Sequence, residues 1–199
     1  MSNSKTKLKP RVIVFAGPNG AGKSTHADAI LAKLGIETFV NADYIARGLS
    51  GRNTDAVAFE AGRIMLKRLH QLAQAKADFA FESTLSSRTF ALFLRRLKTQ
   101  GYAVVIYYFA LSSAQLAVRR VKLRVSLGGH HVPSDVVQRR FGRSLSNFFK
   151  LYSPLADEWT LFDNSGENGA RIIATQSVNH LTVTEAATWQ KLQKLSKTF

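Results

Sequence analysis

The stretch RVIVFAGPNGAGKST, residues 11–25, decides how the rest of the chain is interpreted. Its first six residues are mostly apolar and β-branched, which predicts a buried strand that ends at Gly17. The residues that follow fit the pattern G-x-x-x-x-G-K-[ST], and a segment of helical periodicity comes directly after them. Glycine permits positive φ angles, so successive backbone N–H groups of such a loop can converge on one phosphate group.

This loop predicts a site for a nucleoside triphosphate, with ATP and Mg²⁺ as the expected cofactors. The helix after the loop adds unpaired N–H groups and the positive end of its dipole. Lys23 is expected to contact the β- and γ-phosphates, and the Ser24 hydroxyl is expected to bind Mg²⁺. The residues expected to bind the nucleotide are Gly17, Pro18, Asn19, Gly20, Ala21, Gly22, Lys23, Ser24 and Thr25.

Length and composition favour a single soluble domain. The 199 residues are expected to form a disordered basic tail over 1–10 and a single domain over 11–199. The chain has no cysteine, which excludes disulfides, thiolate metal sites and a thiol nucleophile. No apolar run approaches the roughly 20 residues of a membrane span, and the polar start is not a secretory signal. We therefore expect a cytoplasmic protein with no membrane partner.

The chain carries a net charge of +15, from 28 lysines and arginines against 13 aspartates and glutamates. Such a balance favours polyanionic partners, either nucleic acid or nucleotide phosphates. The basic residues gather between 112 and 150, where Asp135 is the single acid. This local concentration predicts an anion-binding element rather than a general surface property.

Apolar runs alternate with segments of helical periodicity, which predicts an α/β protein with a mostly parallel sheet flanked by helices. Strands are expected at 11–16, 37–43, 79–84, 102–111, 159–165 and 169–176. Helices are expected at 23–34, 54–77, 86–100, 112–127, 134–152 and 184–196, with Ser112 or Ser113 as the N-cap of the fourth.

Two carboxylates follow predicted strands at the edge of the sheet where α/β proteins bind ligands. Asp43 lies just past the second strand, and Glu82 ends the third. A carboxylate at this place can take the proton from an acceptor hydroxyl. The same residues have structural alternatives, because Asp43 could cap the helix that follows and Glu82 could pair with Arg88 at the surface.

The segment 119–143 combines two arginine-rich helices with the loop GGHHVP between them. Its arginines could stabilise a migrating phosphoryl group, and a mobile lid here could exclude water from the reaction. The alternative is two solvated helix faces, which often explain runs of charge.

Three other functions remain open at this point. The loop GPNGAGKST is also typical of ABC transporter ATPases, although no apolar strand that ends in Asp-Glu follows His131. A polynucleotide or nucleoside kinase would also explain the positive charge. A nucleotide-dependent switch or binding module would hydrolyse ATP slowly and transfer phosphate to nothing.

Five motifs in order resemble the zeta-toxin family of P-loop kinases, and in particular its short bacterial branch. They are GPNGAGKST, NADYIARGLS, FESTLSSRT, RVSLGGHHVPSDVVQRRFGRSLSNF and DNS, and the resemblance extends over roughly residues 11–165. The resemblance implies a nucleoside-kinase-like fold and transfer of the γ-phosphate of ATP to a small acceptor, with Mg²⁺. For the family's toxins that acceptor is a hydroxyl of UDP-N-acetylglucosamine, and an antitoxin protein is an implied partner.

The resemblance also implies roles for individual residues. Asp43 would be the catalytic base, and Lys23 would neutralise the phosphates. Glu82, Ser83 and Thr84 would line the acceptor site. The γ-phosphate would be clamped by Arg124 and by one of Arg139, Arg140 and Arg143, with Arg140 expected to be catalytic and with Arg120 and Arg143 expected at the nucleotide. The DNS turn at 163–165 would lie near the adenine.

Overall fold

The structure is a computed structural model and describes residues 9–50, 56–129, 131–178 and 180–199. Most of the tail expected at 1–10 therefore lies outside the described residues, as does His130 of the GGHHVP loop. The strands are β1 (Arg11–Ala16), β2 (Phe39–Val40), β3 (Phe79–Ser83), β4 (Ala103–Ala110), β5 (Glu158–Asp163), β6 (Arg171–Ser177) and β7 (His180–Val183). The helices are α1 (Lys23–Leu34), α2 (Ala42–Ser50), α3 (Ala58–Gln74), α4 (Thr89–Thr99), α5 (Ala114–Ser126), α6 (Ser134–Asn147), the π-helix η1 (Phe148–Tyr152) and α7 (Ala186–Ser196).

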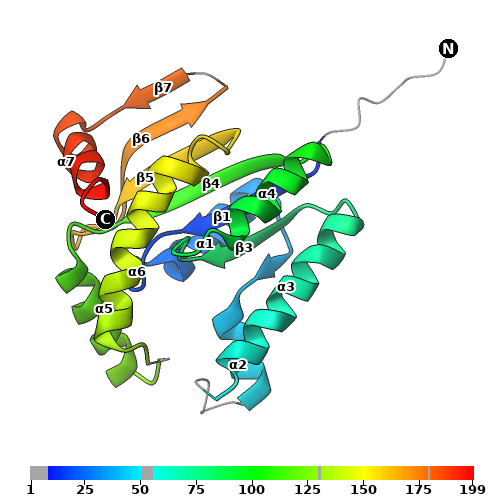
Figure 1. The fold of residues 1–199 in the computed structure, drawn as a ribbon, viewed down its shortest axis with the longest axis horizontal. Coiled ribbons are helices and arrows are strands. Elements are labelled where there is room, and N and C mark those ends of the chain that lie inside the picture. The colour runs from blue at the N-terminus through cyan, green and yellow to red at the C-terminus, as the bar shows by residue number, and fades with distance from the viewer. Residues whose placement is uncertain (1–8, 51–55, 130, 179) are drawn as a thin grey trace.

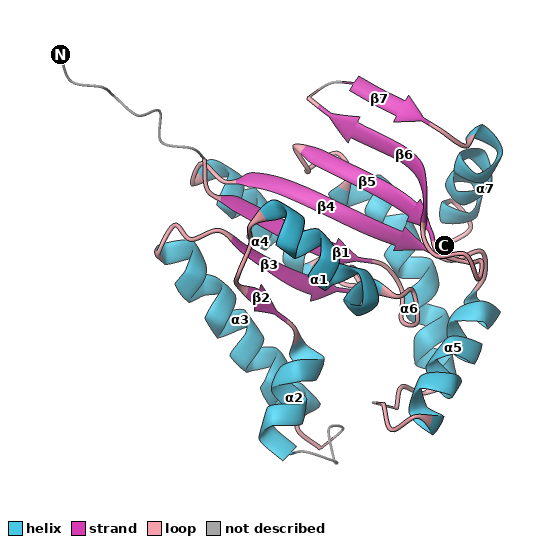
Figure 2. Cartoon of the chain, turned by 180° about the vertical axis from the view of Figure 1, so that it is seen from behind, coloured by secondary structure: helices cyan, strands magenta, loops and turns pink. Residues whose placement is uncertain are grey.

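Within the described residues, one sheet of seven strands runs in the order β2-β3-β1-β4-β5-β6-β7 (Figure 2). The strands from β2 to β5 pair in parallel, and β6 and β7 add an antiparallel hairpin at one edge. The central strand β1 lies between β3 and β4, with Val14 opposite Phe81 on one side and Ile106 on the other. The predicted α/β class with a mostly parallel sheet is confirmed.

Both faces of the sheet are covered, as a parallel sheet requires. Successive side chains of β1 alternate between two hydrophobic cores: Val12 and Val14 pack with α3, α4 and η1, while Ile13 and Phe15 pack with α1, α5 and part of α6. These β1 side chains are at most 1% exposed. The run RVIVFA therefore forms the centre of the fold because it is apolar toward both layers.

Several boundaries differ from those expected from the sequence. The second strand is only Phe39–Val40, because the chain already enters α2 at Ala42. Among the described residues, the long helix expected from 54 begins at Ala58. The helix expected to run unbroken to Tyr152 changes to π-helical pairing at Phe148. The Ser113 hydroxyl caps α5 by accepting a hydrogen bond from the Leu116 N–H at 3.2 Å.

Two helical pairs flank the carboxyl ends of the parallel strands. Figure 1 shows α2 with α3 on one side and α5 with α6 on the other, and each pair is packed together. Strand β1 ends at the edge of the sheet between these two helical pairs, and the glycine-rich loop follows it. No helix in the described parts of the chain has the length and apolarity needed to cross a membrane.

Candidate active site at the carboxyl edge of the sheet

The glycine-rich loop between β1 and α1 is shaped by positive φ angles and by close neighbours. Gly17, Gly20 and Gly22 have φ angles of 136°, 75° and 81°. A Cβ on Gly17 would lie 2.2 Å from the backbone oxygen of Phe109, and a Cβ on Gly22 would lie 2.4 Å from the Asn164 side-chain nitrogen. Both the backbone angles and the packing thus require glycine, which leaves the backbone N–H groups open to an anion.

Asn164 fixes the back of this loop, a role that the sequence alone did not reveal. Its buried side chain donates a hydrogen bond from Nδ2 to the Ala21 backbone oxygen at 2.9 Å. Arg120 holds the same turn by donating to the backbone oxygens of Asn164 at 2.6 Å and of Ser165 and Gly166 at 3.3 Å each. The guanidinium expected at the nucleotide is therefore engaged with the DNS turn, which it ties to α5.

Lys23 and Ser24 meet the carboxylate of Glu82 at the mouth of the loop. The Lys23 ammonium lies 3.4 Å from Glu82 Oε1 and donates to the Pro18 backbone oxygen at 3.1 Å. Glu82 Oε2 accepts hydrogen bonds from Ser24 Oγ at 2.6 Å and from Asn41 Nδ2 at 3.0 Å. Lys23 is 6% exposed and Glu82 is 15% exposed. The alternative pairing of Glu82 with Arg88 at the surface is wrong, because the carboxylate turns inward to the loop.

These oxygen atoms suit Mg²⁺, although they do not form a complete cage for it. Mg²⁺ prefers one or two carboxylates together with substrate phosphates and water. The Ser24 hydroxyl and the Glu82 carboxylate supply such oxygens next to the phosphate loop. The described residues contain no group of three or more His, Cys, Asp or Glu side chains that could hold a metal ion. The donor set thus fits an ion that arrives with a nucleotide.

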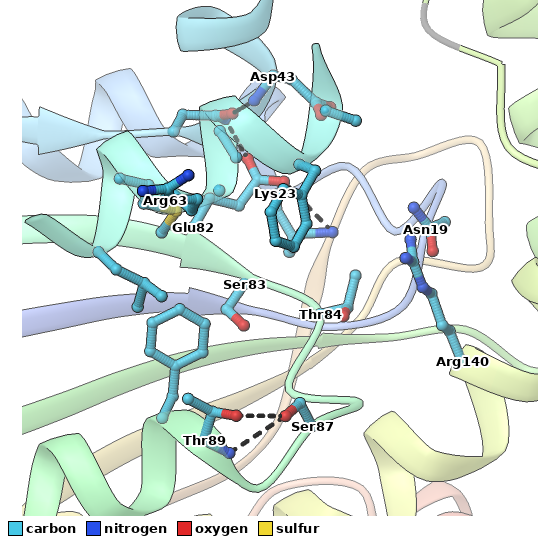
Figure 3. Close-up of a pocket in the computed structure, with 18 of the residues that line it drawn as sticks. Asn19, Lys23, Asp43, Arg63, Glu82, Ser83, Thr84, Ser87, Thr89 and Arg140 are labelled. Atoms are coloured by element: carbon cyan, nitrogen blue, oxygen red, sulfur yellow. Dashed lines mark hydrogen bonds and ion pairs between the residues drawn. The ribbon is translucent and has the colours of Figure 1, made fainter. Parts of the chain in front are cut away.

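A cavity of about 460 Å³ opens beside the loop, and eight of the predicted site residues line it (Figure 3). Lys23, Glu82, Ser83 and Thr84 line it from the sheet side, and Asn19 lines it from the loop. The opposite wall is more apolar. It is formed by α3 and α4 through Ala58, Phe59, Met65, Leu66 and Phe90, with Arg63 among them.

Asp43 and Arg124 both line this cavity, from helices on different sides of the site (Figure 1). Asp43 lies in the first turn of α2, and Arg124 lies in the last turn of α5. Their side chains approach to 3.9 Å, with exposed fractions of 47% for Asp43 and 39% for Arg124. A half-exposed pair at this distance contributes little stability, so a ligand can separate the two groups.

The alternative that Asp43 caps α2 is wrong, because Asn41 takes that part. The Asn41 side-chain oxygen accepts a hydrogen bond from the Asp43 backbone N–H at 2.8 Å, while its nitrogen donates to Glu82. Asn41 thus fixes the start of α2 and the orientation of Glu82 at the same time. The Asp43 carboxylate is left free of the capping role and lines the cavity.

The three arginines of α6 do not share one environment. Arg140 lines the same cavity as Lys23 and Asp43, and in Figure 3 it extends from α6 toward the loop that carries Asn19. Arg143 instead lines a second cavity on the other side of the 84–89 segment, and Arg139 is exposed and lines neither. The expected contact of Arg143 with the nucleotide finds no support in this placement.

The parallel strands of the sheet occur in the order 2-3-1-4-5, and a glycine-rich loop with a lysine follows the first of them. Together these features define a P-loop nucleotide-binding protein with a kinase-like fold. The chain belongs to the AAA domain family, which it matches over residues 12–151. It is also 28% identical over 138 residues to an uncharacterized protein of Haemophilus influenzae, a match that covers 67% of this chain and 94% of that one.

Two solved structures extend the comparison of the fold. The complex of AvrRxo1-ORF1 and AvrRxo1-ORF2 with ATP aligns with a TM-score of 0.74 at 18% identity, over 94% of this chain and 64% of that one. The chain therefore spans just under two thirds of that protein's length. The PezAT toxin-antitoxin system of Streptococcus pneumoniae aligns with a TM-score of 0.62 at 15% identity, over 99% of this chain and 88% of that chain. The expected resemblance to zeta-toxin P-loop kinases is confirmed for the fold.

Proposed function

We propose that the protein is an ATP-dependent kinase that transfers the γ-phosphate to a hydroxyl of a small acceptor. The observation that carries this proposal is the shared cavity, which brings the phosphate-loop Lys23 together with Asp43, Arg124 and Arg140. An ATPase needs only a water molecule beside the γ-phosphate, whereas this cavity of about 460 Å³ is large enough for a small organic molecule.

In the proposed reaction, the loop and α1 hold the phosphates of ATP, and Lys23 leaves Glu82 to neutralise them. Ser24 and Glu82 hold Mg²⁺, which supplies charge neutralisation on the phosphate oxygens. The acceptor oxygen forms a bond to the γ-phosphorus while the bond to the β-γ bridging oxygen breaks, and ADP leaves. The hydroxyl proton passes to the Asp43 carboxylate. Arg124 and Arg140 stabilise the charge on the phosphoryl group in transit.

The walls of the cavity favour an acceptor with both polar and apolar parts. Hydroxyl side chains line the cavity on two sides: Ser83 and Thr84 follow Glu82 at the end of β3, and Ser87 and Thr89 lie at the start of α4 (Figure 3). Phe59 and Phe90 add aromatic side chains to the lining. A nucleotide sugar of the UDP-N-acetylglucosamine kind has hydroxyls at one end and a planar base at the other, so we propose this class of acceptor.

The similarity to the fold of a toxin-antitoxin system further supports a protein partner of the antitoxin kind, in the cytoplasm where ATP is available. This part of the proposal does not depend on the choice of acceptor.

The proposed reaction is tested by incubating the purified protein with γ-³²P-labelled ATP, Mg²⁺ and a panel of UDP-sugars, nucleosides and oligonucleotides. The account predicts label on the UDP-sugar hydroxyl. Label on an oligonucleotide, with an affinity that falls steeply with salt, would instead favour the polynucleotide kinase. Release of labelled inorganic phosphate alone, whatever the acceptor offered, would contradict the kinase assignment.

A further inference from the structure

A second cavity, which the proposed reaction does not use, lies on the other side of the 84–89 segment. Its volume is about 400 Å³. It is lined by Ser86, Arg88, Arg143, Ser146, Asn147, Lys150, Leu151 and Phe199. Three of these residues are cations, and none of the lining residues that the structure describes is an acidic side chain. The remaining polar groups are hydroxyls and an amide, which can donate hydrogen bonds to oxygen.

Two of the lining side chains already donate hydrogen bonds to an oxygen atom of the chain. The oxygen of the Phe199 α-carboxylate accepts hydrogen bonds from Ser146 Oγ at 3.2 Å and from Lys150 Nζ at 3.3 Å. The Phe199 ring lies against α6 at Gly142, where a Cβ would come within 2.3 Å of the ring. Phe199 is 53% exposed, yet it forms one wall of the cavity and accepts a hydrogen bond from Lys150.

Arg88 and Arg143 have no such acceptor. In the part of the chain that the structure describes, neither guanidinium has an ion pair or a hydrogen bond to an acidic side chain. Both side chains are exposed, so packing against the core does not fix the two guanidinium groups in place. The Phe199 carboxylate offsets only one of the three positive charges that line the cavity, so the surface around Arg88 and Arg143 stays electropositive and favours an anion. Guanidinium groups favour phosphate, because two parallel N–H groups match two of its oxygens.

We propose that this second cavity binds the phosphate group of a small phosphorylated molecule, separately from the ATP site. Arg88 and Arg143 hold the phosphate oxygens, and Ser86 and Asn147 add hydrogen-bond donors. The volume accommodates a phosphate with a small organic group attached. This inference concerns binding alone and does not require that the protein is a kinase.

The position of the cavity connects this ligand to the first site. Helix α6 carries Arg140 into the first cavity and Arg143 into the second. The 84–89 segment lies between the two, and Asn147 on α6 donates a hydrogen bond to the Leu85 backbone oxygen at 2.8 Å. A phosphate bound between Arg88 and Arg143 would therefore join the start of α4 to α6. Both of these helices also line the acceptor cavity.

The test uses calorimetric titration of the full-length protein with its ATP site saturated by Mg²⁺ and the non-hydrolysable analogue AMP-PNP. The probes are inorganic phosphate and glycerol 3-phosphate, which separate free phosphate from a phosphate ester. A binding event is expected in the saturated protein, and Arg88→Ala and Arg143→Ala should each weaken it about tenfold, since a charge-assisted hydrogen bond is lost. Arg139→Ala is the matched control, because this arginine is on the same helix and lines neither cavity, and it should leave the affinity unchanged.

Circular dichroism checks that each variant is folded. The absence of any binding event in the saturated protein would overturn the proposal, as would binding that Arg139→Ala weakens as much as Arg143→Ala does. An oligonucleotide that binds through Arg88 and Arg143 when both small phosphates fail would overturn the small-ligand assignment. Failure of labelled ATP to reach any acceptor would contradict the kinase function and leave this inference standing.

Discussion

The substitution Glu82→Gln tests the central group of the site, because this carboxylate has three partners in the structure. It accepts hydrogen bonds from Ser24 at 2.6 Å and Asn41 at 3.0 Å, and it lies 3.4 Å from the Lys23 ammonium. A glutamine has one oxygen and one NH₂ group. If the NH₂ group faces Lys23, two donors oppose each other, and if it faces Asn41, that hydrogen bond is lost.

At least one charge-assisted interaction is thus removed, and Lys23 loses its neutralising charge at a site where it is 6% exposed. Hydrogen bonds to charged groups contribute about 1.5–3 kcal/mol. The free energy of unfolding without nucleotide should therefore fall by about 1.5–3 kcal/mol in Glu82→Gln. Urea denaturation, followed by the fluorescence of Trp159 and Trp189, measures this change. Glu37→Gln is the control, since Glu37 is exposed and should change stability by less than about 0.5 kcal/mol.

The same variant tests the proposed place of Mg²⁺. If Glu82 helps Ser24 to hold the ion, the gain in ATP affinity that Mg²⁺ brings should shrink in Glu82→Gln. ATP without Mg²⁺ should bind at least as well as it does to the wild type, because Lys23 no longer has to leave a carboxylate. Unchanged stability together with an unchanged effect of Mg²⁺ would refute the reasoning.

Three further predictions concern Arg124 on α5, Asn164 behind the glycine-rich loop and Tyr152 in the core. Arg124→Ala should lower the turnover number, measured by steady-state kinetics, by a factor of about 10³–10⁵, while the ATP affinity measured by calorimetry changes little. An equal loss in turnover and in ATP affinity would indicate that Arg124 only binds the nucleotide. Asn164→Ala should lower the free energy of unfolding by about 1–3 kcal/mol and weaken ATP binding, because the Ala21 oxygen loses its buried hydrogen-bond donor. Unaltered ATP affinity would show that the glycine-rich loop keeps its shape without this hydrogen bond. Burial raises the pKa of Tyr152 from 10.0 to about 12, so its contribution to stability is complete below pH 10 and is lost as the pH rises through 12. Urea denaturation between pH 9 and 12 should show that the free energy of unfolding falls less in Tyr152→Phe than in the wild type. An equal fall in both proteins would show that ionisation of Tyr152 does not cause the loss of stability.

The parts of the site that could be predicted from sequence are those encoded within one short segment. The loop from Gly17 to Ser24 was predictable because its glycines, lysine and serine act through adjacent backbone positions. The alternation of apolar runs also predicted the parallel strands, since these are apolar on both faces, but it did not predict β7 at the antiparallel edge. The positions of Asp43 and Glu82 followed from the rule that parallel strands deliver their ends to one edge.

The remaining parts depend on contacts between distant segments. Asn164 meets Ala21 across 143 residues of chain, and Asn41 meets Glu82 across 41, and neither asparagine stands in a local pattern that marks the contact. The sequence offered Asp43 as an alternative cap of α2 and did not identify Asn41, because Asn and Asp are both good caps and only the fold decides between them. Arg143 was grouped with Arg140 as near neighbours on one helix, yet the 84–89 segment separates the cavities that they line.

The most direct test of the account compares ATP binding and phosphoryl transfer in Asp43→Asn, with Asp28→Asn, an exposed aspartate of α1, as the matched control. Single-turnover experiments with labelled ATP and the acceptor found in the panel measure transfer, and calorimetry measures ATP affinity on the same samples. The account predicts that Asp43→Asn binds ATP as the control does and transfers phosphate about 10²–10⁴ times more slowly. Transfer at the control's rate would show that Asp43 is not the base and would contradict the proposed chemistry.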